Sequence, residues 1–319
     1  MKKSILLAIN LLLLILVVVV IVFAFKDKVN SNVEIGNSSD GKLKIITTLF
    51  PEYDFVKQVV GDKADVELIL KSGVETHNFE PTAIDILNIN SSDLFFSLGE
   101  ELEPWTKEVA NSVENKEKII DLSTNVNVMA KDALEEHHEH VHEHDKSLDS
   151  HIWLSLSNAK IMIDTIAQNV SKIEPENAEF YKTNAENYKK EIDKLDKEFR
   201  EIFKDKNITL AFGGEFAYAY FINEYDVNFI SVYTNCGHGE DPSISKVKSV
   251  IDKINENKIP VVFYEELSEG LVAKMISEET EAEALVLYTL HNGNILGENP
   301  DTYVSLMTKN LENIKKAIK

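Results

Sequence analysis

Two patterns of hydrophobic and polar positions alternate along residues 43–319. Short runs rich in β-branched and aromatic residues predict strands, and longer segments with apolar residues at helical spacing separate them. The strand candidates are LKIITTLF, ADVELIL, DLFFSLG and EKIIDLS in the first half, and NITLAFG, VNFISVY, IPVVFYEEL and ALVLYTL in the second. A closing helix is expected from about Thr302 to Ile318. The alternation predicts an α/β fold with two lobes, each a mostly parallel sheet flanked by helices.

One long helix is predicted between the two halves. Pro175 suits a first helical turn, and neither Pro nor Gly follows until Gly213. The apolar positions step by four and three residues through Tyr181, Ala185, Tyr188, Ile192, Leu195, Phe199 and Ile202. A helix of roughly 30 residues would be about 45 Å long, enough to join both lobes as a rigid backbone. A coiled-coil dimer would show the same stripe, but the neighbouring strand–helix units offer a nearer surface, so we expect a monomer.

The N-terminal segment points to export. Lys2 and Lys3 precede an apolar run from Ile5 to Phe25, which approaches the roughly 20 residues that span a bilayer. Either an uncleaved signal-anchor or a cleaved signal peptide fits, and both place the remainder outside the membrane. The predicted organisation is a signal segment 1–28, a linker 29–42, an N-terminal lobe 43–172, a bridging helix 173–205 and a C-terminal lobe 206–319.

The composition of the chain limits the kinds of molecule that it could bind. The formal net charge is −21, which disfavours nucleic acid because a basic face is needed to displace counterions from phosphate. A chain with this negative charge is better suited to binding cations. Cys236 is the only cysteine, so neither a disulfide framework nor a CxxC metal motif can form within the chain.

Four side chains stand where a metal site could form. His77 comes after the strand candidate ADVELIL, Glu215 follows NITLAFGG, and His291 follows the run ALVLYTL. His151 lies on a loop before a predicted helix. Ligands of open α/β sheets bind at the carboxyl ends of the strands. Because two of these residues belong to each half, they could meet only in a cleft between the lobes.

Further candidates are weaker. An acidic loop, residues 135–150, carries His137, His138, His140, His142 and His144. Flexible imidazoles among carboxylates make loose, exchangeable metal sites, although the loop could also be merely a solvated acidic segment. Cys236 and His238 compete with Glu215, since a thiolate binds zinc strongly; the alternative is a small buried cysteine beside a turn.

Several motifs in order carry a family resemblance. These motifs are GVETHNFEPTAIDI, the His-rich loop running into SHIWLSLSNAK, the long helix and TYVSLMTKNLENIKKAI, and the resemblance covers nearly everything from about Leu43 to Lys319. Together they resemble the zinc- and manganese-type metal-binding substrate-binding proteins of bacterial ABC transporters, which have two α/β lobes joined by one rigid helix. The resemblance implies that His77, His151, Glu215 and His291 are the four metal ligands.

The implied ligand order departs from the family's pattern. In the family, the third ligand is usually histidine in zinc binders and glutamate in manganese binders, and the fourth ligand is usually a carboxylate. In this chain the third ligand is Glu215 and the fourth is His291. The total of three imidazoles and one carboxylate still equals the zinc-type set. Nitrogen-rich tetrahedral sites favour Zn²⁺, whereas Mn²⁺ favours oxygen ligands, so zinc is expected and manganese is the alternative.

The function implied by the resemblance is transport. We expect an extracytoplasmic binding protein, membrane-tethered or released after signal cleavage, that captures Zn²⁺ and delivers it to an ABC permease. No enzymatic activity is expected, because a closed four-ligand site leaves no position for an activated water. An anchored zinc hydrolase is a less favoured alternative, and an adhesin or metal buffer without a transporter is a third.

Overall fold

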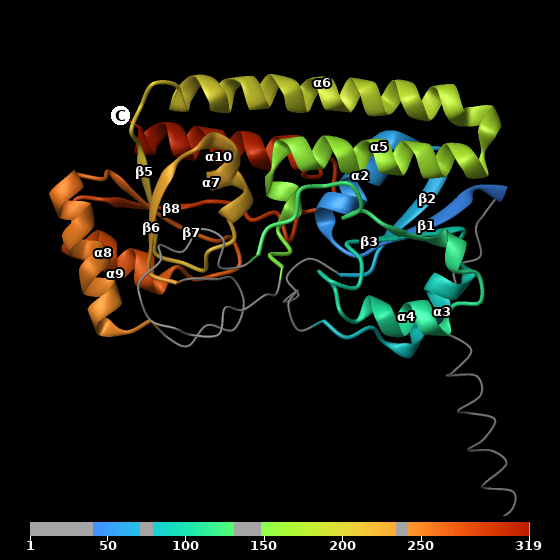
Figure 1. The fold of residues 1–319 in the computed structure, drawn as a ribbon, viewed down its shortest axis with the longest axis horizontal. Helices are drawn as coiled ribbons and strands as arrows, with labels where there is room; N and C mark the ends of the chain where they lie inside the picture. The colour runs from blue at the N-terminus through green and yellow to red at the C-terminus, as the bar shows by residue number, and fades with distance from the viewer. Residues whose placement is uncertain (1–40, 71–78, 131–147, 234–241, 319) are drawn as a thin grey trace, which may run out of the picture. The chain divides into compact units, whose positions relative to one another are not determined.

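The computed structural model describes residues 41–70, 79–130, 148–233 and 242–318 (Figure 1). The chain divides into two units, Met1–Gly41 and Lys42–Lys319, and every element named below belongs to the second. The predicted signal segment and nearly all of the linker lie outside the described residues. So do His77, the five histidines of the acidic loop, Cys236 and His238.

The first half of the Lys42–Lys319 unit alternates strands and helices as predicted. Its elements are β1 (Leu43–Thr47), α2 (Phe50–Val60), β2 (Ala64–Leu68), α3 (Ala83–Ser91), β3 (Leu94–Ser97), α4 (Thr106–Ser112), the 3₁₀ turn η2 (Lys116–Lys118) and β4 (Ile119–Asp121). The strands form a four-stranded sheet in the order β2-β1-β3-β4, with every pair parallel. Pairing runs from Leu43 opposite Ala64 to Thr47 opposite Leu68.

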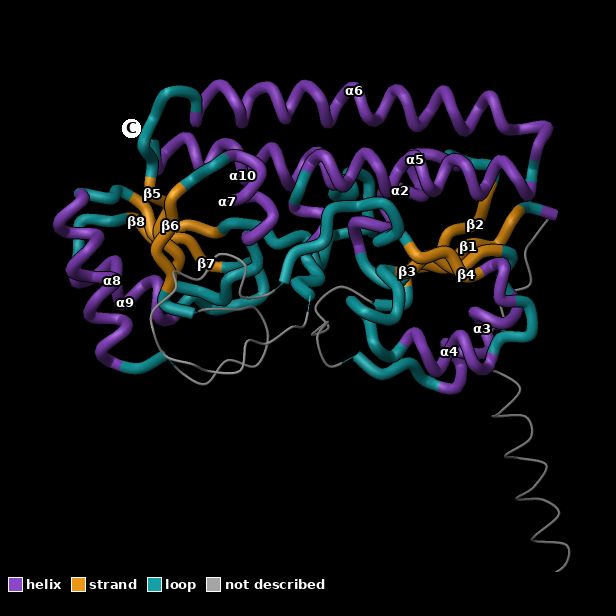
Figure 2. The backbone as a smooth tube through the Cα atoms, in the orientation of Figure 1, coloured by secondary structure: helices purple, strands orange, loops and turns teal. Residues whose placement is uncertain are grey.

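The second half repeats this arrangement. Its elements are β5 (Thr209–Phe212), α7 (Ala219–Tyr225), β6 (Asn228–Ser231), α8 (Ile244–Asn257), β7 (Val261–Tyr264), α9 (Leu271–Glu279), β8 (Glu283–Val286) and α10 (Tyr303–Ala317). The sheet order is β6-β5-β7-β8, again parallel throughout. The predicted fold of two parallel sheets flanked by helices is confirmed, and Figure 2 shows helices and strands in each half.

Burial separates the inner strands from the edge strands. All residues of β1 and β3 are buried, whereas β8 is exposed or half-buried along its length. This is the expected pattern for parallel sheets, because helices cover both faces of the inner strands. In both sheets the strand order reverses between the two inner strands, and ligands of such sheets bind at the carboxyl ends beside that reversal.

A helical layer connects the halves. After the 3₁₀ turn η3 (Ile152–Leu154) come α5 (Leu156–Ile173), the 3₁₀ turn η4 (Pro175–Asn177) and α6 (Ala178–Phe203). Proline lacks an N–H and disfavours a helical residue before it, so α5 ends before Pro175 and the long helix begins after it. The 26 residues of α6 make a helix about 40 Å long at about 1.5 Å per residue. The domain boundaries expected from the sequence remain predictions.

The apolar stripe of α6 packs against both halves. The predicted stripe is buried except at its last member, where Phe203 takes the buried position and Ile202 is only partly covered. Asn184 donates its side-chain N–H to the carbonyl of Val59 at the end of α2, and Tyr225 of α7 donates its hydroxyl to Asp196 of α6 at 2.9 Å. Figure 1 shows α6 running along both α5 and α10 in this layer. The prediction that one helix braces both lobes is thereby confirmed.

No helix among the described residues is long and apolar enough to cross a membrane.

Candidate metal centre

His151 is held by a neighbouring carboxylate. It precedes η3, and its backbone N–H donates to Asp149 Oδ1 at 2.8 Å. Its ring Nδ1 lies 2.6 Å from the same oxygen. A carboxylate only accepts, so Nδ1 carries the proton and Nε2 carries the lone pair that can ligate a metal. Both side chains are buried, which fixes the ring in place.

His291 is held through a threonine. Its Nδ1 lies 2.7 Å from Thr289 Oγ1. That hydroxyl lies 3.0 Å from Glu266 Oε1 and 3.1 Å from Oε2, and the Thr289 N–H donates to Oε2 at 2.7 Å. Burial raises the pKa of Glu266, and the hydrogen bonds that Thr289 donates oppose that rise.

The structure brings His151 and His291 together. Their ring centroids lie 4.9 Å apart with the planes at 79°. The Nε2 atoms of both rings are buried. Trp153 packs edge-on against each imidazole, with centroids 5.4 Å from His151 and 5.3 Å from His291. Imidazole nitrogens are good ligands for zinc, so the pair fits two positions of a zinc site.

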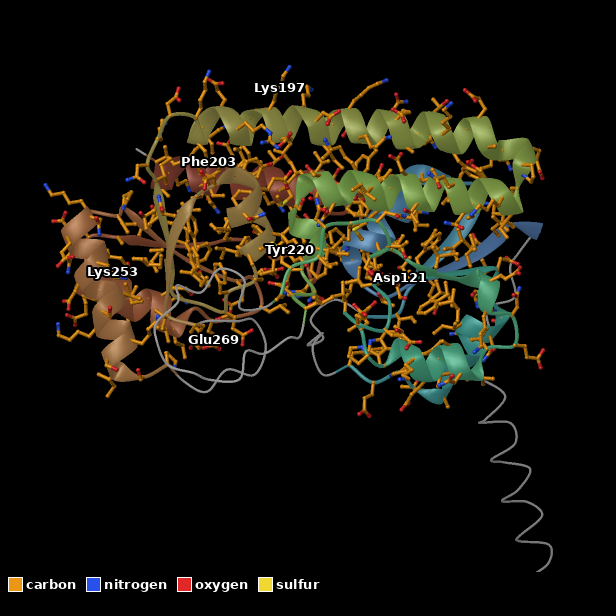
Figure 3. The ribbon with its side chains drawn as sticks, viewed as in Figure 1. Asp121, Lys197, Phe203, Tyr220, Lys253 and Glu269 are labelled. Atoms are coloured by element: carbon orange, nitrogen blue, oxygen red, sulfur yellow. The ribbon has the colours of Figure 1, made fainter. Side chains whose placement is uncertain are left out.

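Contacts from the second half secure the loop of His151. Tyr220 of α7 donates its hydroxyl to the Asp149 carbonyl at 2.8 Å and accepts from the Met129 N–H at 3.0 Å. Trp153 donates its indole N–H to the Thr289 carbonyl at 2.8 Å. Figure 3 places Tyr220 between the two sheets. The loop that carries His151 is therefore anchored to the half that carries His291.

Glu215 lies on a closely packed turn after β5. A Cβ at Gly213 would lie 2.8 Å from the Ala273 backbone of α9, and one at Gly214 would lie 1.9 Å from Glu265 Oε2. The two glycines therefore let the chain turn against α9 and the end of β7. Burial, and then the nearby charge of Glu215, raise the pKa of Glu265.

The structure pairs only part of the predicted ligand set. Among residues 41–70, 79–130, 148–233 and 242–318, no three His, Cys, Asp or Glu side chains converge into a group that could hold a metal. His77, Glu215 and the weaker candidates stay predictions.

The residues that orient the rings of His151 and His291 were not among those predicted from the sequence. Asp149 and Thr289 each stand two positions before a candidate histidine, in the triplets Asp-Ser-His and Thr-Leu-His. The spacing of two was the only sequence signal, and the fold does not use it through an extended strand, because Leu290 has a φ of 64°. Glu266 carried no such signal, because only the folded chain brings it to Thr289. Trp153 is buried, and it contacts both imidazoles.

A second polar cluster lies at the carboxyl ends of β1 and β3. Thr48 Oγ1 lies 2.5 Å from Glu52 Oε2 and 3.0 Å from Glu103 Oε2. Both carboxyl groups are buried. Burial, and then the Glu103 charge, raise the pKa of Glu52; burial raises the pKa of Glu103 to about 7. Because one hydroxyl proton cannot serve two carboxylates, this arrangement favours a proton held by the pair.

The sequences of known proteins align with most of this chain. The high-affinity zinc uptake system protein ZnuA of Bacillus subtilis is 31% identical over 298 residues, covering 91% of this chain and 92% of that protein. The zinc-binding protein AdcA of Streptococcus pyogenes serotype M3 is 30% identical over 293 residues, covering 87% of this chain and 56% of that protein. The chain thus spans about half the length of the AdcA relatives that it matches.

A solved structure agrees with the fold. The Zn(II)-bound ZnuA-like domain of Streptococcus pneumoniae AdcA superposes with a TM-score of 0.72 at 27% identity, covering 87% of this chain and 99% of that one. The sequence profile of the ZnuA family, described as zinc-uptake complex component A, periplasmic, matches residues 45–317. By this match and by its two-lobed fold, the chain belongs to the ZnuA family of zinc-uptake components.

Proposed function

We propose that this protein captures Zn²⁺ outside the membrane and delivers it to an ABC permease. The observation that carries the proposal is the buried pair His151 and His291, with ring centroids 4.9 Å apart and each Nδ1 engaged by a neighbouring side chain. That arrangement presents the two Nε2 atoms as metal ligands. His77 and Glu215 are proposed to complete the set, giving three imidazoles and one carboxylate.

The names of the relatives support zinc as the cargo. Both ZnuA of Bacillus subtilis and AdcA of Streptococcus pyogenes are described as zinc proteins. Donor chemistry points the same way, since imidazole suits zinc better than manganese. The protein acts as a carrier without turnover, held near the membrane by its N-terminal segment.

The hydrolase alternative has one motif in its favour. His138, Glu139 and His142 have the HExxH spacing of zinc metalloproteases. The segment lies outside the described residues, and the ligand pair described above does not use it. A carrier should bind metal tightly without hydrolysing peptides or esters, whereas a hydrolase would show turnover that chelation abolishes.

Metal analysis tests the proposal. Protein purified without added metal is assayed for its elements, stripped, and titrated with zinc and manganese in competition. One tight zinc ion per chain, not displaced by a large excess of manganese, is expected. Protein that retains manganese against zinc, or holds no ion tightly, would refute the assignment.

A further inference from the structure

Thr289 is the centre of a small hydrogen-bond network behind the candidate site. Its hydroxyl contacts His291 Nδ1 and the Glu266 carboxylate, its N–H donates to Glu266, and its carbonyl accepts the Trp153 indole N–H. Thr289 is only 2% exposed. Four polar contacts on one buried residue constrain its backbone and its side-chain rotamer together.

Counting protons fixes the direction of the hydrogen bonds. A threonine hydroxyl has one proton, and the Glu266 carboxylate can only accept. The Thr289 hydroxyl therefore donates to Glu266 and accepts from His291 Nδ1–H. The same ring nitrogen is protonated in His151, where Asp149 is the acceptor. Both rings are thus held in the tautomer that places the lone pair on Nε2.

We propose that Thr289 and Glu266 are positioning residues for metal binding: they fix the tautomer and orientation of His291 without contacting the ion. This inference rests on the proposed function, because it assumes that His291 ligates through Nε2. Glu266 follows β7 and Thr289 follows β8, so the network ties the His291 segment to the end of a neighbouring strand.

The network also reaches the other half of the unit. Trp153 lies edge-on against both imidazoles, and its indole N–H is bound by the Thr289 carbonyl. The position of Thr289 therefore governs both the His291 ring and the indole that supports the pair. If Thr289 had only a structural role, it would stabilise the fold without selecting a tautomer of His291. The two roles can therefore be told apart by measuring that tautomer.

Three variants test the proposal. Thr289→Val keeps the shape and removes the hydroxyl, Thr289→Ser restores a hydroxyl, and Glu266→Gln removes the acceptor charge. Thr308→Val is the matched control, because it makes the same change at an exposed position of α10. Each protein is checked by circular dichroism and thermal unfolding, and its zinc affinity is measured by chelator competition.

Loss of the hydroxyl should lower zinc affinity by about 10- to 100-fold, the range typical of groups that orient metal-bound histidines. Thr289→Ser should recover most of that loss, Glu266→Gln should show a smaller loss in the same direction, and Thr308→Val should match the wild type. A folded Thr289→Val protein that binds zinc as tightly as the wild type would overturn the proposal. So would a Thr289→Ser protein as weak as Thr289→Val.

The tautomer gives a readout that needs no metal. Imidazole ¹H–¹⁵N correlation spectra of the metal-free protein should show His291 protonated at Nδ1, and this signature should be lost in Thr289→Val. An Nε2–H tautomer in the wild type would overturn the inference, whether or not a variant folds. If the wild type failed to bind zinc, the proposed function would fall, while the tautomer measurement would still decide the role of Thr289.

Discussion

The imidazoles of His151 and His291 meet nearly at right angles, with centroids 4.9 Å apart. One comes from the loop before η3 and the other from the segment after β8. Two nitrogens bound to one tetrahedral zinc at about 2.0–2.1 Å lie roughly 3.3 Å apart, so rings this close can share an ion after small adjustments. Asp149 and Thr289 fix both rings before any ion arrives, which lowers the entropy lost on binding.

Removing either histidine should abolish tight binding. His151→Ala and His291→Ala each leave the site one imidazole short, so each should lower zinc affinity by at least about 100-fold. Chelator competition measures the loss. The double variant should bind zinc no more tightly than the weaker single variant, because both residues act on one site. A single variant that binds as the wild type does would contradict a shared ion.

The His-rich loop should contribute only weak sites. Deleting Glu135–His144 removes five imidazoles, and ordering such a loop around an ion costs conformational entropy. Isothermal titration calorimetry should show that the tight ion remains and only weaker binding disappears. Replacing the same five histidines with asparagine controls for loop length. Loss of the tight ion in both variants would move the principal site into the loop.

Trp153 should report metal arrival at the histidine pair. The chain has two tryptophans, and the ring contacts of Trp105 are with Phe79 and Phe95, not with the histidine pair. In a Trp105→Phe background, one equivalent of zinc should change the Trp153 emission, because the indole touches the rings of both proposed ligands, His151 and His291. Adding His291→Ala should remove the change. An emission that ignores zinc while one ion binds tightly would place that ion elsewhere.

The free energy of unfolding should fall as pH rises through the range in which the buried pair Glu52 and Glu103 loses its proton. Glu103 has its pKa raised from 4.5 to about 7 in the fold, so the folded chain binds more protons than the unfolded chain between these values. The free energy of unfolding therefore decreases from about pH 4.5 to 7 on account of this pair. Glu52→Gln removes one charge and keeps an oxygen that can accept the N–H groups of Thr48 and Leu49.

The Glu52→Gln variant should be stabilised by about 1–2 kcal/mol at pH 8, with a smaller effect at pH 5. Thermal or urea unfolding across this range measures the difference. The matched control is Glu256→Gln, which changes an exposed residue of α8. Equal pH profiles for the wild type and Glu52→Gln would show that the pair carries no shared proton.

The pattern of apolar and polar residues along the chain was enough to predict the fold. All eight strand candidates and the bridging helix are confirmed, since buried parallel strands and a long amphipathic helix leave clear periodicities. The start of α6 was the least predictable part, because Pro175 joined a 3₁₀ turn rather than the long helix.

The site was only partly predictable for a physical reason. His151 and His291 could be proposed from their places near strand ends and from the family resemblance. The partners that orient them depend on side-chain directions in loops, which no periodicity encodes. Glu266 meets Thr289 across 23 positions of sequence, and Tyr220 meets Asp149 across 71.

Locating the zinc ion directly tests the central claim. Crystals of the protein with one equivalent of zinc are measured on both sides of the zinc absorption edge. The predicted result is one strong anomalous peak about 2.0–2.1 Å from Nε2 of both His151 and His291. A peak elsewhere in the chain, with these two rings uncoordinated, would contradict the account.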